Sequence, residues 1–382
     1  MNTLKAALSE LDEATQDLLS EHHFDRDTWL SLASNIQAAS GDVPSNLISG
    51  ELQPPSSQNL HTLPPEKSED AARLIDLGMN AIANDEVMVL VLNGGMATRF
   101  GGVVKGVVPV LDNLTFIGWK LQSTAQASRG HHPRVLFLNS FSTHEATLQH
   151  LEHTDAAGYP RDRIETAIQN ISLRLTPEGA LFKNAKGDVS PYAPGHGDVL
   201  DTLKRSDAFH RFRKGGGKYV FMCNVDNILA TLDPLILGAH IDRGLSMTVE
   251  SAPRVKGDKG GAPIAVNGRV EIVEGFRIPQ DFDIECLEVF NTNTFWMNVE
   301  CWDIQDDLTW FTANKIVDDL PALQFERLIG EITHFVDASY LRVSREGKAS
   351  RFFPVKTPDE LEPARKTLID RLKEAENHKK ID

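Results

Sequence analysis

The sequence predicts an α/β fold with helices on both faces of a central sheet. Two segments, VMVLVL (87–92) and YVFMCNVD (219–226), are apolar over most of their length, as is typical of buried strands in a parallel sheet. From residue 87 onward such strands alternate with segments of helical periodicity, which is the pattern of α/β architecture. The 382-residue length accommodates one large domain with an appendage, or two domains.

The region before residue 87 is predicted to add helices and a connector. Leucines at helical spacing indicate two short helices within residues 1–40, with Asp25 able to cap the second. Residues 52–66 contain four prolines, so we expect an extended connector draped over the main domain, not a helix or central strand. A further helix is expected over residues 68–84.

After the strand at 87–92, the pattern predicts the remaining elements in order. Helices are expected near 113–128, 143–153 and 197–210, with strands at 135–139, 164–168 and 219–226. Residues 245–300 are strand-rich. Later elements are helices at 302–306, 315–319 and 322–337, a strand SRFFPV (350–355) and a charged helix at 358–378.

The composition limits the classes of partner. With 39 basic and 54 acidic residues the net charge is −15, which argues against a nucleic-acid partner. No apolar run approaches the roughly 18 residues of a membrane span, and the acidic N-terminus does not resemble a signal peptide, so we expect a cytoplasmic protein. The three cysteines are too scattered for a disulfide framework or a zinc site, and we expect Cys286 to be a buried, inert thiol.

A glycine turn follows the first buried strand, in the segment LNGGMATRFGG (92–102). Ligands of open α/β sheets bind beyond the carboxyl ends of the strands, where glycines let the backbone approach phosphates and free N–H groups bind anions. By itself the segment matches neither GxGxxG nor GxxxxGK[ST], and a purely structural turn explains it equally well. Lys105 can reach phosphates that the turn holds, which favours a binding loop.

The segment SPYAPGHGDVL (190–200) places a Pro-Gly-His-Gly-Asp turn at the start of a predicted helix. Its glycines permit close backbone contact and leave His196 free to donate to a phosphate oxygen. Asp198 can cap the helix. A lone histidine is usually structural, but the flanking glycines favour a functional one here.

The segment FMCNVDNILATLDP (221–234) ends a buried strand with Asp226, between Asn224 and Asn227. Mg²⁺ is commonly held by one or two carboxylates together with substrate phosphates, so Asp226 is a candidate magnesium ligand. The alternative is that Asp226 only caps the next helix.

These segments together resemble the sugar nucleotidyltransferases, and within them the UDP-sugar pyrophosphorylase family over residues 65–361. The turn with Lys105 is similar to the family's signature loop, PGHGD to its PPGHGD and FMCNVDNILATLDP to its SNxDNLGATVD. KGDKGGAPI (256–264), VFNTNTFWMN (289–298) and SRFFPVKTPDEL (350–361) follow in family order and resemble KGG, FNTNN and RFLPVK. The last two favour the glucose-1-phosphate branch over the N-acetylhexosamine branch.

The resemblance implies a fold and a division of the chain. The expected fold is a Rossmann-like mixed sheet of the sugar nucleotidyltransferase (GT-A-like) type, with a helical N-terminal extension and no C-terminal β-helix. The expected parts are an N-terminal helical extension and Pro-rich connector (1–66), a nucleotidyltransferase catalytic domain (67–340), and a C-terminal strand, active-site lysine segment and helix (341–382).

The resemblance also implies a role for each site residue. Three cations, of which Lys356 swings over the active site, would neutralise phosphate charge: Lys105, Lys356 and Arg99. The nucleotide would contact Leu92, Asn93, Gly94, Gly95, Gln169 and Gly195, with Gln169 and Gly195 at the uracil. The sugar phosphate would contact His196, Asn224, Lys259, Gly260, Glu274, Asn291 and Asn293. Asp226 would bind Mg²⁺.

The reaction that the resemblance implies is in-line attack of glucose 1-phosphate on the α-phosphorus of UTP, giving UDP-glucose and pyrophosphate. The nucleophile is already anionic, so positioning and charge neutralisation suffice. Alternatives are another sugar 1-phosphate, such as galactose or N-acetylglucosamine, a glycosyltransferase of related fold, or a catalytically silent nucleotide-sugar-binding protein. Only Ala97, where the family usually has glycine, and the altered sequence after Gln169 support the silent protein. We expect a monomer or weak oligomer.

Overall fold

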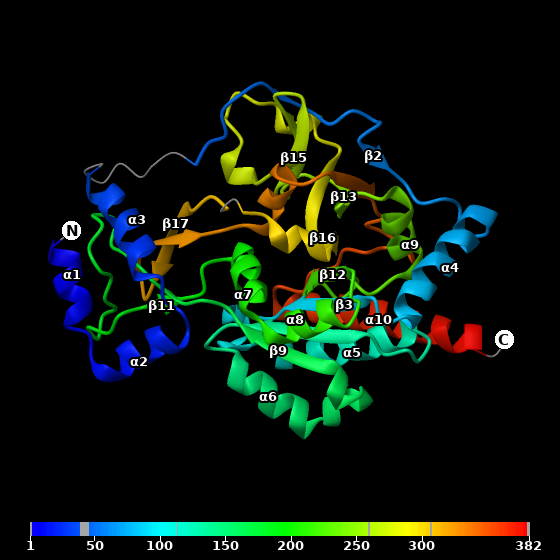
Figure 1. Cartoon of the computed structure of the whole chain (residues 1–382), viewed down its shortest axis with the longest axis horizontal. Helices are drawn as coiled ribbons and strands as arrows, with labels where there is room; N and C mark the ends of the chain where they lie inside the picture. The colour runs from blue at the N-terminus through cyan, green and yellow to red at the C-terminus, as the bar shows by residue number, and fades with distance from the viewer. Residues whose placement is uncertain (1, 39–45, 113, 259, 306–307, 380–382) are drawn as a thin grey trace.

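The structure is a computed structural model that describes residues 2–38, 46–112, 114–258, 260–305 and 308–379. Its centre is an eight-stranded sheet (Figure 1). The strands lie in the order β2 (Leu60–His61), β19 (Ala338–Arg342), β13 (Met247–Pro253), β16 (Val289–Asn298), β12 (Tyr219–Asn224), β3 (Val87–Leu92), β8 (Arg134–Asn139) and β9 (Ile164–Ile168). Strand β16 is antiparallel to both neighbours and the other pairs are parallel, so the expected mixed sheet is confirmed.

Alternate residues of the central strands face two different hydrophobic cores, because successive side chains of a strand point to opposite faces. In β3, Val89 and Val91 join one core, whereas Met88 and Leu90 join the other. The first core is closed by α4 (Glu69–Ala83), α5 (Phe116–Ala127), α6 (His144–His153), α9 (Pro234–Arg243) and α10 (Leu361–Lys379), and the second by α7 (Val199–Arg205) and α8 (Asp207–Lys214). Helices therefore cover both faces, as the apolar runs predicted.

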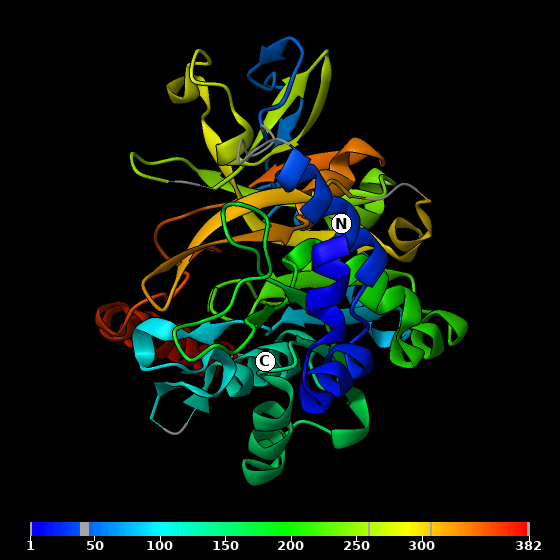
Figure 2. The same cartoon turned by 90° about the vertical axis from the view of Figure 1, so that its left-hand side faces the viewer.

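Two smaller assemblies flank the central sheet. A three-stranded sheet of β1 (Leu52–Gln53), β14 (Ala262–Val266) and β15 (Arg269–Val273) stands above it (Figures 1 and 2). At the left of Figure 1 the helices α1 (Asn2–Ser9), α2 (Glu13–Glu21) and α3 (Arg26–Ala38) close a third core with β10 (Ser172–Leu173) and β18 (Leu320–Glu326). The Trp29 indole N–H of α3 donates to the Leu173 carbonyl at 2.7 Å, which ties this end to the body of the molecule.

The proline-rich connector lies extended, as expected. Its β1 pairs with β14 of the three-stranded sheet, and its β2 pairs with β19 at the edge of the central sheet. Two short strand pairs, β4 (Met96–Ala97) with β5 (Val103–Val104) and β6 (Pro109–Leu111) with β7 (Leu114–Thr115), then lead from β3 to α5. Strand β11 (Pro191–Tyr192) pairs with β10. The helix expected from 113 begins only at Phe116, because Leu114 and Thr115 belong to β7 and the Thr115 hydroxyl caps α5.

The expectation of helices at 315–319 and 322–337 is wrong. The chain instead forms a hairpin of β17 (Phe311–Val317) and β18, and residues 329–334 form only a 3-10 turn. Asp318 and Asp319 at the tip both have positive φ, which is the geometry of a two-residue hairpin turn. Leu323 and Phe325 of β18 pack into the third core, so long-range packing overrides a local pattern that also suits a helix.

Other expectations need smaller corrections. Residues 2–38, which the structure describes, form three helices instead of two, although Asp25 does accept from the Thr28 amide at 3.0 Å at the start of α3. The helix expected over 197–210 is broken into α7 and α8 at Ser206, whose hydroxyl caps α8. The helix expected at 302–306 is a 3-10 segment, Val299–Asp303, and Cys286 is exposed, contrary to expectation.

The segment SRFFPV forms no strand; it makes only isolated bridges. By contrast, the helices at 68–84, 143–153 and 358–378 and the strands at 135–139, 164–168 and 219–226 are confirmed within a few residues. In the part of the chain that the structure describes, no helix is long and apolar enough to cross a membrane.

Helices α4 and α9 approach each other through two glycines. A Cβ atom on Gly78 would lie 2.0 Å from the Pro234 carbonyl oxygen, and one on Gly238 would lie 1.8 Å from the Leu74 carbonyl oxygen. Backbone cannot move aside as a flexible side chain can, so these positions leave no room for a methyl group.

Gly238→Ala is therefore expected to force α4 and α9 apart and lower the free energy of unfolding by about 1–3 kcal/mol, the usual cost of overpacking. Chemical denaturation measures the change. Arg243→Ala, at an exposed position of the same helix, is the control and should have a small effect. A Gly238→Ala protein as stable as the wild type would show that the helices are not in close contact.

Candidate active site

Two cavities meet at Asp226, beyond the carboxyl ends of β3 and β12. The first, of about 350 Å³, is lined by Leu92, Gly94, Gly95, Lys105, Gln169, Ala193, Gly195, His196, Asn224, Val225 and Asp226. The second, of about 590 Å³, is lined by Asn224, Asp226, Asn227, Asp258, Gly260, Phe290, Asn291, Thr292, Asn293, Arg345, Phe352, Phe353, Pro354, Lys356 and Glu360. We call them the glycine-loop cavity and the Asn cavity. Residues that are far apart in the sequence thus come together as the strand-end argument predicts.

The glycine turn after β3 forms one wall of the glycine-loop cavity. Gly94 leaves room for Gln169, whose Oε1 would lie 2.4 Å from a Cβ at Gly94. Asn93 does not line the cavity: its side chain is buried and donates to Asn139 Oδ1 at 2.8 Å and Thr147 Oγ1 at 2.9 Å. The Asn93 backbone amide also donates to the Leu138 carbonyl at 2.8 Å, so this fully buried residue anchors the turn and does not face a ligand.

Cationic residues meet at the boundary between the two cavities. Lys105 is buried, with its Nζ 4.3 Å from the centre of the Phe100 ring. Burial lowers the pKa of Lys105, and the carboxylates of Asp226 and Glu360 oppose that shift. Lys356, at the far side, is exposed and lines the Asn cavity. Arg99 is exposed in the short turn Thr98–Phe100, and its charge adds to the lowering of the Lys105 pKa.

The carboxyl group of Asp226 lies among these cations. Burial raises the pKa of Asp226, while Lys105, Lys356 and Lys120 lower it. The next helix, α9, is capped by Asp233, which accepts from the Leu235 amide at 2.9 Å. Asp226 is therefore not needed as a helix cap, and its carboxylate faces the two cavities.

The Pro-Gly-His-Gly-Asp turn forms the wall opposite the glycine loop. Gly195 has φ +82°, and a Cβ there would lie 2.5 Å from the Arg327 carbonyl oxygen, so this position requires glycine. Its carbonyl accepts from the Gln169 side-chain amide at 2.9 Å. The turn and Gln169 therefore form a continuous surface on which a base could rest.

His196 is held in one tautomer. Its Nδ1 accepts from the Ile329 amide at 3.0 Å, so the proton of the neutral ring is on Nε2, and the side chain lines the glycine-loop cavity. Burial lowers the pKa of His196 to about 4. At neutral pH the side chain is thus an uncharged N–H donor, as the proposed contact with a phosphate oxygen requires.

The expectation that Asp198 caps the helix is wrong. It makes no side-chain capping bond to α7 and instead forms a buried ion pair with Arg327 at 2.7 Å. It also accepts from the Asn170 amide at 2.7 Å. The carboxylate is fully buried, and a buried carboxylate is stable only when it is paired and hydrogen-bonded.

The Asn cavity is lined by amide side chains from β12 and β16. The side-chain amide of Asn293 donates to Asn224 Oδ1 at 3.0 Å, and the Asn293 backbone amide donates to Asn291 Oδ1 at 2.9 Å. Asn293 has φ +56°, next to the register shift between β13 and β16 at Glu250/Ser251, and its Oδ1 is buried without a hydrogen-bond partner. Asn293 is thus a residue of uncommon backbone conformation in the wall of the Asn cavity.

Of the remaining predicted substrate contacts, some line a cavity and others do not. Gly260 lines the Asn cavity. Glu274 accepts a hydrogen bond from the Gly261 amide and does not line either cavity; burial raises its pKa. Lys259 lies outside the described residues. The structure thus brings together all the other predicted side chains except Asn93, Arg99 and Glu274.

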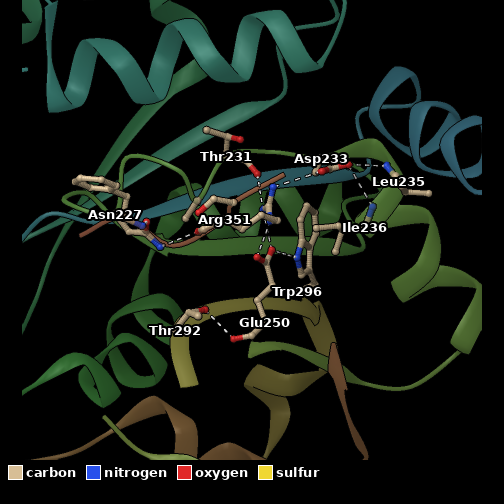
Figure 3. A network of polar contacts seen from close by, with 12 residues as sticks. Asn227, Thr231, Asp233, Leu235, Ile236, Glu250, Thr292, Trp296 and Arg351 are labelled. Carbon is tan, nitrogen blue, oxygen red and sulfur yellow. Dashed lines mark hydrogen bonds and ion pairs between the residues drawn. The ribbon is translucent and has the colours of Figure 1, made fainter. Parts of the chain in front are cut away.

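The segment that carries Lys356 is held against the Asp226 loop. The Val355 amide donates to the Asp226 carbonyl at 3.0 Å, and the Phe353 amide donates to Asn227 Oδ1 at 2.9 Å. Arg351 forms a buried fork to Glu250, with Nε–Oε2 of 2.6 Å and Nη2–Oε1 of 2.7 Å (Figure 3). The backbone of this segment bonds to the Asp226 loop and Arg351 reaches Glu250 in the middle of β13, so the segment pairs with no strand of the sheet.

Further residues that shape the site were not singled out in the sequence. Glu250 and Lys120 are buried charges, and the Lys120 ammonium donates to the carbonyls of Asn227 (2.7 Å) and Ala230 (2.6 Å). Asp258 pairs with Arg345 beside the Asn cavity. In the sequence, Glu250 and Lys120 could be recognised only as single charged residues inside the apolar segments SMTVESA and FIGWKLQ. Such a pattern predicts a buried charge but does not identify the residue that pairs with it.

Asp226 is the carboxylate that would hold the expected magnesium ion. Within the described ranges no group of three or more His, Cys, Asp or Glu side chains could hold a metal. A single carboxylate at a phosphate-sized cavity still fits Mg²⁺, which usually keeps water and phosphate oxygens as its other ligands. Asp226 therefore remains a suitable ligand, provided that the substrate supplies phosphates.

The sequence was compared with known proteins. It matches the UTP–glucose-1-phosphate uridylyltransferase family over residues 49–379. A UTP–glucose-1-phosphate uridylyltransferase of Pyrus pyrifolia is 31% identical over 315 residues, which cover 78% of this chain and 64% of the relative. This chain thus spans a little under two thirds of the length of that relative.

The fold was compared with solved structures. A uridine diphosphate N-acetylglucosamine pyrophosphorylase of Trypanosoma brucei superposes with a TM-score of 0.72 over 95% of this chain and 84% of that chain, at 17% identity. A UDP-glucose pyrophosphorylase mutant of Leishmania major in complex with UDP-glucose gives 0.69 over 94% and 77%, at 22% identity. The mixed sheet is thus shared with UDP-sugar pyrophosphorylases.

The pH dependence of stability tests the burial of His196. With a pKa of about 4 in the folded protein against 6.5 ordinarily, the unfolded chain binds more protons between these values. His196 thus contributes stability above pH 6.5 that is lost as the pH falls toward 4. In this window the free energy of unfolding of the wild type should fall with decreasing pH. We expect His196→Gln to reduce the slope of the free energy of unfolding against pH by up to about 1.4 kcal/mol per pH unit.

The measurement is chemical denaturation at several pH values. His131→Gln, at an exposed position, controls for the loss of a histidine. Equal slopes in the wild type and His196→Gln would contradict the buried, neutral state of His196.

Proposed function

The chain belongs to the family of UTP–glucose-1-phosphate uridylyltransferases, and from this premise we propose that it joins glucose 1-phosphate to UTP, giving UDP-glucose and pyrophosphate. The observation that carries the proposal is the convergence of Lys105, Lys356 and Asp226 where the two cavities meet. A metal-binding carboxylate between two cations is suited to a triphosphate, whose charge must be neutralised before an anion can attack it. We propose as well that the mixed sheet is of the GT-A-like type that the resemblance implies.

The two cavities offer separate places for the two substrates. The glycine-loop cavity offers the Gly94–Gly95 turn for phosphates and the Gln169–Gly195 surface for the uracil. The Asn cavity offers Asn291 and Asn293 for the glucose hydroxyls. Both cavities share Asn224 and Asp226, so the sugar phosphate and the α-phosphate of UTP would meet there.

The reaction needs no protein base. A phosphate oxygen of glucose 1-phosphate attacks the α-phosphorus of UTP, an O–P bond forms, and the bond from the α-phosphorus to the oxygen bridging to the β-phosphorus breaks. Lys105 holds the departing pyrophosphate, and Arg99, exposed outside the two cavities, would have to turn inward to join it. Lys356 neutralises the charge at the α-phosphate, and His196 donates its Nε2 proton in a hydrogen bond to the sugar phosphate. The protein contributes position and preorganised charge.

A magnesium ion held by Asp226 would supply further charge neutralisation between the phosphates. Asp226 suits this because its nearest charged neighbours are lysines, which favour the carboxylate form. Their charges alone would also attract a triphosphate, so the metal and the lysines act in the same direction.

The direct test mixes UTP, Mg²⁺ and a panel of glucose, galactose and N-acetylglucosamine 1-phosphates, and measures pyrophosphate release. We expect release with glucose 1-phosphate. Release with galactose or N-acetylglucosamine 1-phosphate alone would support the alternative substrates. Binding of UDP-glucose without turnover would indicate a silent binding protein and refute the proposed activity.

The lysines provide a second prediction. Lys105→Gln and Lys356→Gln are each expected to lower kcat by about 10²–10³-fold, because each removes a preorganised charge from the transition state. Lys366→Gln, at an exposed position of α10, is the matched control and should leave kcat unchanged. Steady-state pyrophosphate release measures all three. Full activity in Lys105→Gln would remove it from the mechanism.

Asp226→Asn tests the metal ligand. We expect a large loss of turnover and a higher half-saturating concentration of Mg²⁺, because an amide oxygen is a weaker ligand than a carboxylate. Asp242→Asn, in an exposed ion pair with Arg73, is the control. An unchanged magnesium requirement in Asp226→Asn would place the metal elsewhere.

A further inference from the structure

Arg327 lies behind the Pro-Gly-His-Gly-Asp turn and does not line the glycine-loop cavity. Its side chain is buried, and its guanidinium forks between two carboxylates of that region, with Nη2 2.7 Å from Asp198 and Nη1 2.7 Å from Asp201. The guanidinium carbon also lies 4.4 Å from the centre of the Trp310 ring. Arg327 is therefore fixed from three sides.

The backbone next to Arg327 supports the turn directly. The Arg327 amide donates to the Pro194 carbonyl at 2.9 Å, and its carbonyl accepts from the Gly197 amide at 2.8 Å. Two residues on, the Ile329 amide donates to His196 Nδ1. The tautomer of His196 thus depends on the place of the segment that Arg327 anchors.

Asp198 links Arg327 to the other wall of the cavity. Asp198 accepts from the Asn170 backbone amide at 2.7 Å and from its side-chain amide at 2.9 Å. Asn170 directly follows Gln169, whose side chain donates to Gly195. One carboxylate therefore holds both the Gln169 strand end and the glycine turn.

The charge of Arg327 stabilises the buried carboxylate of Asp198. Asp198 is fully buried, and a buried carboxylate without a cation is strongly unfavourable, so it would protonate or turn toward water. Either change weakens its bonds to Asn170. The effect would reach Gln169, Gly195 and His196, none of which lines the Asn cavity.

We propose that Arg327 is a positioning residue for the nucleotide: through Asp198 and the Ile329 amide it sets the places of Gln169, Gly195 and His196, and so controls the affinity for UTP without touching it. The inference rests on the proposed function, in which UTP occupies the glycine-loop cavity. The Asn cavity shares none of the residues that Arg327 holds. Only His196 among those residues is proposed to contact the sugar phosphate, so the affinity for glucose 1-phosphate should depend on Arg327 less than the affinity for UTP does.

The test compares KM values in the full chain. Arg327→Gln is expected to raise KM for UTP by about 10- to 100-fold, the scale of small misplacements in a binding site. KM for glucose 1-phosphate should rise less, because His196 is the one positioned residue proposed to contact the sugar phosphate. Arg213→Gln is the control, because Arg213 also forms a bidentate ion pair, with two contacts of 2.7 Å to Asp303, but is partly exposed and lines neither cavity. It should leave both KM values unchanged.

A second variant and a spectroscopic measurement cover the case in which Arg327→Gln does not fold. Arg327→Lys keeps the charge but cannot fork to two carboxylates, so a rise in KM for UTP smaller than that of Arg327→Gln is expected. The ¹⁵N shifts of the His196 ring report its tautomer, which is expected to be Nε2–H in the wild type and mixed in the Arg327 variants.

The outcomes separate the two proposals. An unchanged KM for UTP with an unchanged His196 spectrum in a folded Arg327 variant would overturn the positioning role, as would an equal rise in both KM values. A wild type that turns over no sugar phosphate would instead contradict the proposed function, and the His196 spectrum would still decide the positioning role.

Discussion

The buried ion pair between Glu250 and Arg351 is the interaction on which the arrangement of the site depends. Removing two charges from water costs several kcal/mol per ion, so the pair is tolerated only because its geometry is good and its remaining donors and acceptors are satisfied. The fork of Arg351 onto Glu250 is joined by the Trp296 indole N–H at 2.9 Å, and Arg351 also donates to the Thr231 carbonyl at 2.8 Å (Figure 3). The segment after Arg351 is thus fixed against the middle of β13 and the loop that follows β12.

The position of Lys356 follows from that anchor. Arg351 fixes the start of a stretch whose later amides bond to the Asp226 loop, so the lysine and the carboxylate are held relative to each other by main chain. Lys120 supports the same loop from below through two carbonyls. The charged groups that would meet phosphate therefore stand on a rigid base, as preorganised electrostatic catalysis requires.

The two walls of the glycine-loop cavity are joined by similar means. A glycine at 195 lets the backbone lie against residue 327, and the buried Asp198 connects this turn to the end of β9. The Asn cavity depends on a different device, the register shift between β13 and β16 that turns Asn293 toward Asn224. The two cavities therefore rest on different networks and meet only at the end of β12.

Much of the site could be predicted because it lies in short contiguous motifs. Gly94, Lys105, His196 and Asp226 each follow a buried strand or open a helix, and strand ends gather at one edge of a parallel sheet. The partners of Asp198 and Glu250 could not be predicted, because Arg327 and Arg351 lie more than a hundred residues away in the sequence. The hairpin at 311–326 was missed for the same reason, since packing against the N-terminal helices selects it.

The sequence by itself determined the α/β class, the order of the central strands and helices along the chain, and the residue types that gather at the strand ends, because local periodicity and glycine placement encode them. Only the tertiary structure decided that Asp198 pairs with Arg327, that residues 350–355 bond to the Asp226 loop, and that Asn93 anchors the turn. The physical reason is that a buried charge or backbone group must find a partner, and the partner is chosen by the packing of the whole chain.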